Sequence, residues 1–277
     1  MEAWIGHEAA VRYYALIGSF GLVAVWEALA PHPGRTASVA GRWGINVGLA
    51  LLLSVVVALV FPLLAVGVAL AAERASFGLL NVVRVPGWLA FVVAFVAIDA
   101  GRYAMHALLH RVPLLWRLHR VHHSDVAFDC STALRFHPLE GLVTVSAQLA
   151  LVAALGAPAA AVLAYEVVTA FVSLFSHGNL RLPAAVDRAL RHAIVTPGMH
   201  RIHHSARLAE SGTNYGSVLT CWDRLLRTYR AAPLGDEDAM PIGLADVRDA
   251  RARDLRWLLA APFLRNRASG GATPAPR

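Results

Sequence analysis

Five long apolar segments dominate the chain through residue 175, and polar, arginine-rich stretches separate and follow them. An α-helix needs about 20 mostly apolar residues to cross a bilayer, so the pattern predicts a helical membrane protein. Pro62 lies inside the second segment and predicts a kink there, because proline donates no backbone hydrogen bond. The segments are Val11–Ala30, Ile45–Ala72, Trp88–Leu109, Leu139–Leu155 and Ala159–Phe175.

The last two segments are slightly short for spanning helices, and only Gly-Ala-Pro at 156–158 separates them. They predict a tight helical hairpin that enters the bilayer and returns to the same face. We therefore expect an all-α, polytopic membrane protein with about five membrane-embedded helices. The third segment then ends at the face where the hairpin begins and ends. A histidine-rich helical cap is predicted outside the bilayer at that face.

Composition supports a membrane protein. Hydrophobic residues make up 57% of the chain and charged residues only 16%, against about 25% in an ordinary soluble domain. The net charge is +7 and every basic residue is arginine. These arginines flank apolar segments, which indicates membrane-surface charge and argues against nucleic-acid binding. By the positive-inside rule we expect the histidine-rich face to be cytoplasmic, in a bacterial inner membrane.

The histidines are unevenly distributed, and eleven of the 13 lie between residues 106 and 204. Residues four apart on a helix lie one turn apart on one face, so His106 and His110 can share a metal. The motif H-x-x-H-H then occurs twice, starting at His119 and at His200. In each motif one histidine pair has this one-turn relation, and the third histidine points about 100° away, toward a second ion.

Nine histidines at one depth exceed the ligands that one ion takes, so the pattern suggests two ions. Imidazole suits iron, zinc, copper and nickel. Two acids share helical stripes with these histidines: Asp99 precedes His106 by seven residues, and Glu166 precedes His177 by eleven. An acid in a membrane helix is costly, so each is predicted to orient an imidazole or to pair with an arginine such as Arg102.

Residues 95–230 resemble the fatty acid hydroxylase superfamily, which includes sterol desaturases and related membrane di-iron oxygenases. The resemblance is carried, in the family's order, by HALLHRVPLLWRLHRVHHS, ALRFHPLE, FSHGNL, TPGMHRIHHS and NYGSVLTCWDRLLRTYR. Leu226 and Arg227 stand where the family often has Phe-Gly, so we expect that turn to differ locally.

The resemblance implies that no catalytic side chain acts separately from the metal centre. His137 would be a ligand or would support one, and Asn214 and Asp223 would have supporting roles. The implied metal ligands are His106, His110, His119, His122, His123, His177, His200, His203 and His204.

The resemblance also implies the activity. Two iron ions would use O₂ and two external electrons to hydroxylate or desaturate a C–H bond of a lipid such as a sterol, fatty acyl chain or ether lipid. The chain contains neither G-x-G-x-x-G nor a P-loop, so a ferredoxin, cytochrome or reductase is expected to donate the electrons. The alternative is a non-redox zinc-binding membrane protein, a carrier or regulator.

The domain organisation follows from the same features. We expect N-terminal transmembrane helices over 1–90, the di-iron domain over 91–230 and a cytoplasmic C-terminal segment over 231–277. The start of the chain has no basic region before its first apolar segment, which predicts an uncleaved anchor. The Gly/Ala/Pro-rich end predicts a disordered tail.

Overall fold

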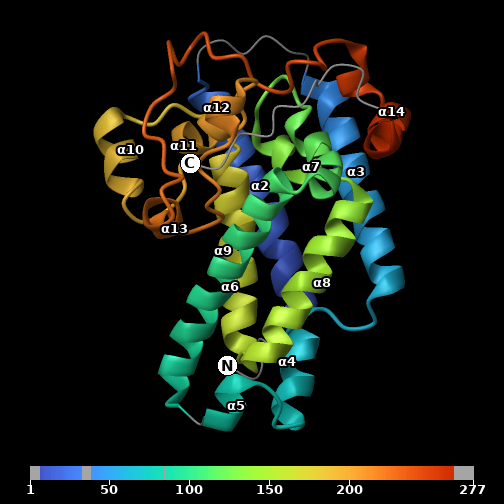
Figure 1. Ribbon diagram of the computed structural model, residues 1–277, viewed down its shortest axis with the longest axis vertical. Coiled ribbons are helices and arrows are strands. Elements are labelled where there is room, and N and C mark those ends of the chain that lie inside the picture. Colours follow the sequence, from blue (N-terminus) through green and yellow to red (C-terminus); the bar gives the residue numbers. More distant parts are fainter. Residues whose placement is uncertain (1–6, 33–38, 84, 265–277) are drawn as a thin grey trace.

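The computed structural model describes residues 7–32, 39–83 and 85–264, and the expected disordered tail lies outside them. Within these residues the protein is helical and has no β-strand, only isolated bridges between loops (Figure 1). This confirms the predicted all-α fold.

Five candidate membrane spans confirm the predicted polytopic membrane protein. The principal helices of the first, third, fourth and fifth spans begin and end within a few residues of the predicted apolar segments. A single turn at Gly156 joins the last two of them, as the predicted hairpin requires. The helices are α2 (Glu8–Leu29), α3 (Val39–Val60), α6 (Gly87–Arg111), α8 (Pro138–Leu155) and α9 (Ala159–Ser176).

The second apolar segment is broken rather than kinked. Helix α3 ends at Val60, two residues before Pro62, and α4 (Ala65–Arg74) begins three residues after it. Proline cannot donate to the carbonyl four residues back and its ring crowds that carbonyl, so the helix ends there. The short α5 (Leu79–Val83) follows at the same end of the molecule as the turn between α8 and α9 (Figure 1).

The spanning helices point their histidine-bearing ends the same way. In Figure 1, α6 rises from the end marked by α5, α8 descends to that end and α9 rises again beside α6. Small buried side chains such as Ala69, Ala94 and Ala161 let these helices approach closely. The end of α6, the start of α8 and the end of α9 therefore meet at one end of the bundle.

A cap of short helices covers that end (Figure 1). Most are only one or two turns long, because proline and glycine punctuate the polar parts of the chain. The cap contains α7 (Pro113–His123), η1 (Cys130–Leu134), α10 (Ala184–Leu190), α11 (Pro197–His203), α12 (Leu208–Ser211), α13 (Cys221–Leu225), η2 (Ala250–Arg253), α14 (Leu255–Ala260) and η3 (Ala261–Phe263).

Two glycines fix the other end of the bundle. Gly78 has φ +98° and Gly156 has φ +61°, both in the left-handed region. A Cβ added to Gly78 would lie 2.2 Å from the backbone nitrogen of Gly156. The turn after α4 and the turn between α8 and α9 are therefore in backbone contact.

We expect Gly78→Ala to lower the free energy of unfolding by about 2 kcal/mol or more, because it adds strain and a backbone clash. Thermal unfolding in detergent measures the loss. Gly48→Ala in α3 is the matched control, since its Cβ would meet nothing within 4 Å. Equal melting temperatures for the two variants would contradict the close contact of the turns.

Candidate metal centre

The nine histidines named by the sequence pattern come together in two adjacent groups. Within each group, one ring nitrogen from every member lies within 4.8 Å of those of the others. Group A contains His106, His110, His119, His123 and His203. Group B contains His122, His177, His200 and His204.

Helical spacing explains the division. The i, i+4 pairs of α6, α7 and α11 each stay in one group, because residues one turn apart face the same way. In α7 the pair is His119 and His123, and His122 points to group B. In α11 the pair is His200 and His204, and His203 points to group A. Each H-x-x-H-H motif thus contributes to both groups.

The two groups share a boundary of stacked imidazoles. The rings of His123 in group A and His204 in group B stack with centroids 4.4 Å apart. His119 and His122 lie 5.2 Å apart across the same boundary. Two ions held by these groups would therefore be neighbours.

In group A, every Nε2 atom is buried without a hydrogen-bond partner among the described residues. Five such atoms in one place are unfavourable, since a buried polar atom without a partner costs about 1–3 kcal/mol. A cation between them removes that cost. The donor set of group A therefore fits a metal ion.

In group B, three Nε2 atoms converge. The His177 Nε2 lies 3.2 Å from that of His122 and 3.1 Å from that of His200. Two nitrogens bound to one ion at about 2.0–2.1 Å each lie about 3 Å apart when their bonds are at right angles. Both ring nitrogens of His204 are buried without a partner. Group B therefore also fits a metal ion.

Hydrogen bonds to Nδ1 fix the orientation of several rings. Nδ1 of His106 donates to the Tyr215 carbonyl at 2.9 Å, and Nδ1 of His203 donates to the Thr213 carbonyl at 2.8 Å. In group B, Nδ1 of His177 donates to the Ser173 carbonyl at 2.7 Å. A proton held at Nδ1 leaves the lone pair on Nε2, the atom that faces the group.

Glu140 holds His119 by the same kind of bond, with its carboxylate 2.7 Å from Nδ1. Both side chains are buried. The motif R-F-H-P-L-E contained this glutamate, but sequence reasoning gave it no role. Its position in the first turn of α8, opposite α7, could not be read from spacing.

Burial keeps four imidazoles of the two groups neutral at pH 7, because it lowers the pKa of each. It lowers the pKa of His203 to about 3 and the pKa of His177 to about 4. It also lowers the pKa of His122 and His204 well below the ordinary value. Metal ligation requires neutral imidazole, so the rings are ready to bind without losing protons.

Asp99 has partners other than the histidines. Its carboxylate accepts hydrogen bonds from the Tyr165 hydroxyl and the Trp222 indole, and from the backbone N–H groups of Val218 and Leu219. The carboxylate therefore anchors the loop before α13 against α6. That loop follows Tyr215, whose carbonyl orients His106.

Glu166 and His137 also lie outside both groups. The Glu166 carboxylate is 3.4 Å from Arg12 of α2. His137 is the N-cap residue of α8: its Nδ1 accepts from the Leu139 N–H, and its Nε2 donates to the Leu259 carbonyl at 3.2 Å.

Asn214 and Asp223 support the loops that hold the imidazoles. Asn214 donates to the carbonyls of Met199 and Arg230, which ties α11 to the segment after α13. Asp223 accepts from the backbone N–H groups of Tyr215 and Gly216. The Tyr215 carbonyl that orients His106 is held in place by this carboxylate.

The turn after α13 contains a left-handed residue that is not glycine. Arg227 has φ +58°, in the left-handed region where glycine is preferred. A non-glycine residue pays about 1–2 kcal/mol there. The Asp223 carbonyl accepts the Thr228 N–H at 2.8 Å and helps to hold the turn.

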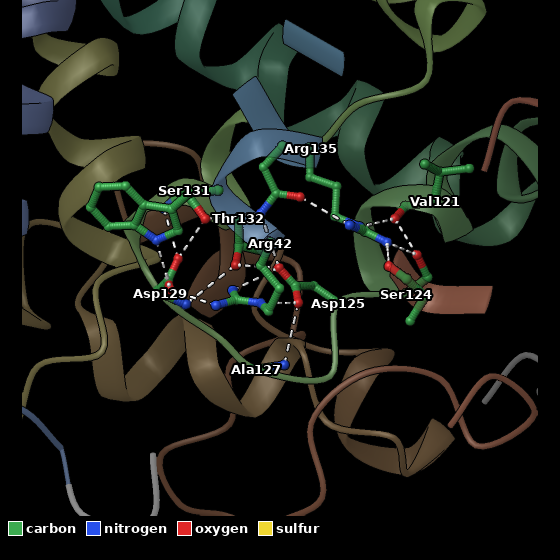
Figure 2. Close-up of polar contacts among 12 residues, drawn as sticks. Arg42, Val121, Ser124, Asp125, Ala127, Asp129, Ser131, Thr132 and Arg135 are labelled. Atoms are coloured by element: carbon green, nitrogen blue, oxygen red, sulfur yellow. Dashed lines mark hydrogen bonds and ion pairs between the residues drawn. The ribbon is translucent and has the colours of Figure 1, made fainter. Parts of the chain in front are cut away.

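A buried ionic network connects α3 to the loop between α7 and α8 (Figure 2). Arg42 donates to Asp125 at 2.8 and 2.9 Å and to Asp129 at 2.7 Å. Arg135 donates to the Val121 carbonyl and to Ser124, and its own carbonyl accepts from Nδ1 of His122. The network therefore reaches group B through one backbone carbonyl.

The arginines of this network lower the pKa of Asp125. Burial alone would raise the pKa of Asp125, but the hydrogen bond from Arg42 and the charges of Arg135 and Arg42 lower it to about 2. The carboxylate is therefore ionised at any ordinary pH. Sequence reasoning missed the network because its members are far apart in the chain.

A cavity of about 470 Å³ opens beside both groups, between α3, α6, α8 and α9. Five of the nine histidines line it. They are His106, His119, His122, His177 and His200.

We expect Asp125→Asn to lower the free energy of unfolding by about 3–5 kcal/mol, because it leaves the buried Arg42 without half of its ionic partners. Chemical or thermal unfolding in detergent measures the loss. Asp249→Asn is the matched control, since Asp249 pairs with Arg251 at the exposed surface, where an ion pair contributes little. Equal effects of the two substitutions would contradict a structural role for the network.

Comparison with known proteins supports the family resemblance that the sequence motifs indicated. The fatty acid hydroxylase family model matches residues 91–228. The ornithine lipid hydroxylase OlsE of Rhizobium tropici is 37% identical over 142 residues, which cover 51% of this chain and 42% of that protein.

Two further relatives are a monooxygenase and a hydroxylase with other named substrates. The human alkylglycerol monooxygenase is 30% identical over 138 residues, covering 50% of this chain and 30% of that protein. The rat cholesterol 25-hydroxylase is 26% identical over 145 residues, covering 51% and 47%. The chain thus matches less than half the length of these relatives, and no solved structure matches it. On the family match and these relatives, the chain belongs to the fatty acid hydroxylase superfamily.

Proposed function

We propose that this protein is a membrane-bound di-iron oxygenase that hydroxylates or desaturates a C–H bond of a lipid. Group A and group B would each hold one iron. The observation that carries the proposal is the convergence of nine imidazoles, seven of them buried and most with unpartnered Nε2 atoms, beside a cavity between membrane helices. Imidazole suits several metals, and iron is chosen because the family uses it.

A lipid substrate fits the location of the cavity. Its walls come from helices that cross the membrane, so an apolar chain can reach it from the bilayer. Two relatives are named for lipids and a third for cholesterol. Each of these names describes a hydroxylase or a monooxygenase.

The bound irons would activate O₂, so that one oxygen atom enters the C–H bond and the other leaves as water, with two electrons and two protons from an external donor. The chain's own residues hold this centre. Carbonyls and Glu140 fix the Nδ1 protons, which directs Nε2 lone pairs inward. Most of the cavity wall is apolar, which suits a hydrocarbon substrate.

The proposal also includes the side of the membrane at which the metal centre lies. We place the metal centre at the cytoplasmic face, because arginines are abundant in the cap that carries it. A ferredoxin, cytochrome or reductase would reach it there. We also propose 91–230 as the oxygenase unit, with 1–90 as membrane anchor and 231–277 as a cytoplasmic extension.

We expect metal content to follow the two groups. Wild-type protein purified without oxygen should contain two irons per chain, and His110→Ala in group A and His204→Ala in group B should each lose one or both. Inductively coupled plasma mass spectrometry measures iron and zinc. His137→Ala is the control, since this ring lies outside both groups and should keep both irons. Zinc at full occupancy without iron would favour the zinc-binding alternative.

We expect the protein to oxidise a membrane lipid at the expense of O₂. Membranes of a bacterial host expressing the wild-type chain, grown under ¹⁸O₂, should contain a lipid heavier by one ¹⁸O atom or lighter by two hydrogens. Lipid mass spectrometry detects either product, and the His204→Ala strain should lack both. Identical lipids in the two strains, with iron present in the wild type, would contradict the proposal.

A further inference from the structure

The wall of the main cavity changes character with depth along two helices. On α6, His106, Arg102 and Ile98 follow one another at four-residue intervals, and all three line the cavity. Each interval is about 6 Å along the helix. The cavity therefore passes from imidazole through a guanidinium to an apolar end.

The facing wall on α8 has the same order. Glu140, Thr144 and Gln148 lie at successive turns, and Leu151 follows them. Gln148 is about 15 Å along α8 from its first residues, and Arg102 is about 14 Å from the end of α6. The guanidinium and the amide therefore lie at similar depth. We call this pair, Arg102 and Gln148, the polar belt.

Below the belt the walls are apolar. Ile98 lies one turn below Arg102 on α6 and Leu151 lies about one turn below Gln148 on α8, and both side chains line this end. An alkyl chain fits such walls and a hydrated ion does not. The deep end is therefore suited to a hydrocarbon tail.

Among the described residues Arg102 makes no hydrogen bond and no salt bridge, and its charge interacts with the Glu166 carboxylate only at longer range. The acid one turn away, Asp99, is engaged by Tyr165, Trp222 and two backbone N–H groups. A guanidinium inside a membrane helix is costly unless it pairs or serves a ligand. Because Arg102 lacks a direct hydrogen-bonded partner, its guanidinium can bind an anion in the cavity.

A second cavity of about 340 Å³ meets the first at the belt. Arg102 and Gln148 line both cavities. Glu166, also on the wall of the second cavity, lies 3.4 Å from Arg12 and thus has a cationic partner of its own. Neither belt side chain has all its polar atoms buried, so both can reach a ligand.

We propose that the polar belt binds the carboxylate or phosphate of an anionic lipid, whose tail lies in the apolar end and whose polar head extends toward the histidines. The proposal rests on the oxygenase function and adds the substrate class. Arginine holds carboxylate and phosphate through paired N–H donors, and Gln148 supplies a further donor. Since the anion lies about one helical turn from His106, the oxidised C–H bond belongs to the polar head.

Binding can be tested without turnover. The probes are dodecanoate, dodecyl phosphate and dodecanol, which share one chain length and differ in charge. Metal-loaded wild-type protein in an uncharged detergent should melt at a higher temperature with either anion than with dodecanol. The larger of the two anionic shifts distinguishes a carboxylate substrate from a phosphate one. Equal shifts with all three probes would overturn the proposal.

Substitution locates the binding site. Arg102→Leu should abolish the larger rise in melting temperature that the anions produce. The expected loss is a ten- to hundredfold weaker affinity for the anion, which is the effect of removing about one hydrogen bond to a charged group. Arg102→Lys should restore part of it. Arg74→Leu is the matched control, because it removes an exposed arginine at the opposite end of the bundle. Unchanged metal content would show that Arg102→Leu is folded, and an anionic shift that persists in it would overturn the proposal.

The position of oxygen in the product gives a separate test. Tandem mass spectrometry of the ¹⁸O-labelled lipid should place the oxygen in the polar head, and Arg102→Leu should reduce kcat/KM at least tenfold. Oxygen deep in an acyl chain, or a neutral product formed equally by Arg102→Leu, would overturn the anion subsite but leave the oxygenase function standing. Arg102-dependent anion binding without any oxidised lipid would leave the subsite standing and contradict the oxygenase.

Discussion

Buried imidazole nitrogens that face one another without hydrogen-bond partners are the constraint on which this structure depends. Each would destabilise the fold by about 1–3 kcal/mol if nothing lay between them. The chain tolerates them because their opposite nitrogens are tied to fixed acceptors, among them the Tyr215 and Thr213 carbonyls and Glu140. Rings held from behind in this way present a preformed set of ligands, and binding a cation adds to the stability of the cap.

The membrane helices make this arrangement possible. Three of them end at the same face, so histidines far apart in the chain meet there (Figure 1). The Arg42–Asp125 ion pair fastens α3 to the loop after α7, and Asp99 fastens the loop before α13 to α6. Both contacts bury charge where water is scarce. They hold the cap in one position over the cavity that the helices enclose.

Local spacing predicted the parts of this structure that depend on one helix. Four of the five apolar runs predicted their spanning helices to within a few residues, and the four-residue interval placed His106 beside His110. The same spacing left open which neighbour of His119 shares its ion, and the structure pairs it with His123. At Pro62 the sequence pattern suggested a kink, whereas α3 ends two residues before it, because proline lacks the backbone donor and its ring crowds the preceding turn.

Contacts between distant segments could not be predicted in this way. Asp99 lies on the histidine stripe of α6 as expected, yet its partners come from residues 165 and 218–222. Glu140 of α8 contacts His119 of α7, and Arg42 pairs with acids more than 80 residues away in the chain. Each depends on how helices pack, which hydrophobic periodicity alone does not specify.

The central claim is that two neighbouring groups of histidines hold a pair of irons. Mössbauer spectroscopy of oxidised, iron-57-enriched protein in detergent tests it most directly, because two ferric ions close enough to share a bridge couple their spins. A coupled pair should give a quadrupole doublet without magnetic splitting at liquid-helium temperature. In a strong applied field, it should show only the splitting that the applied field itself produces. Magnetically split spectra of isolated ferric ions would contradict a paired centre.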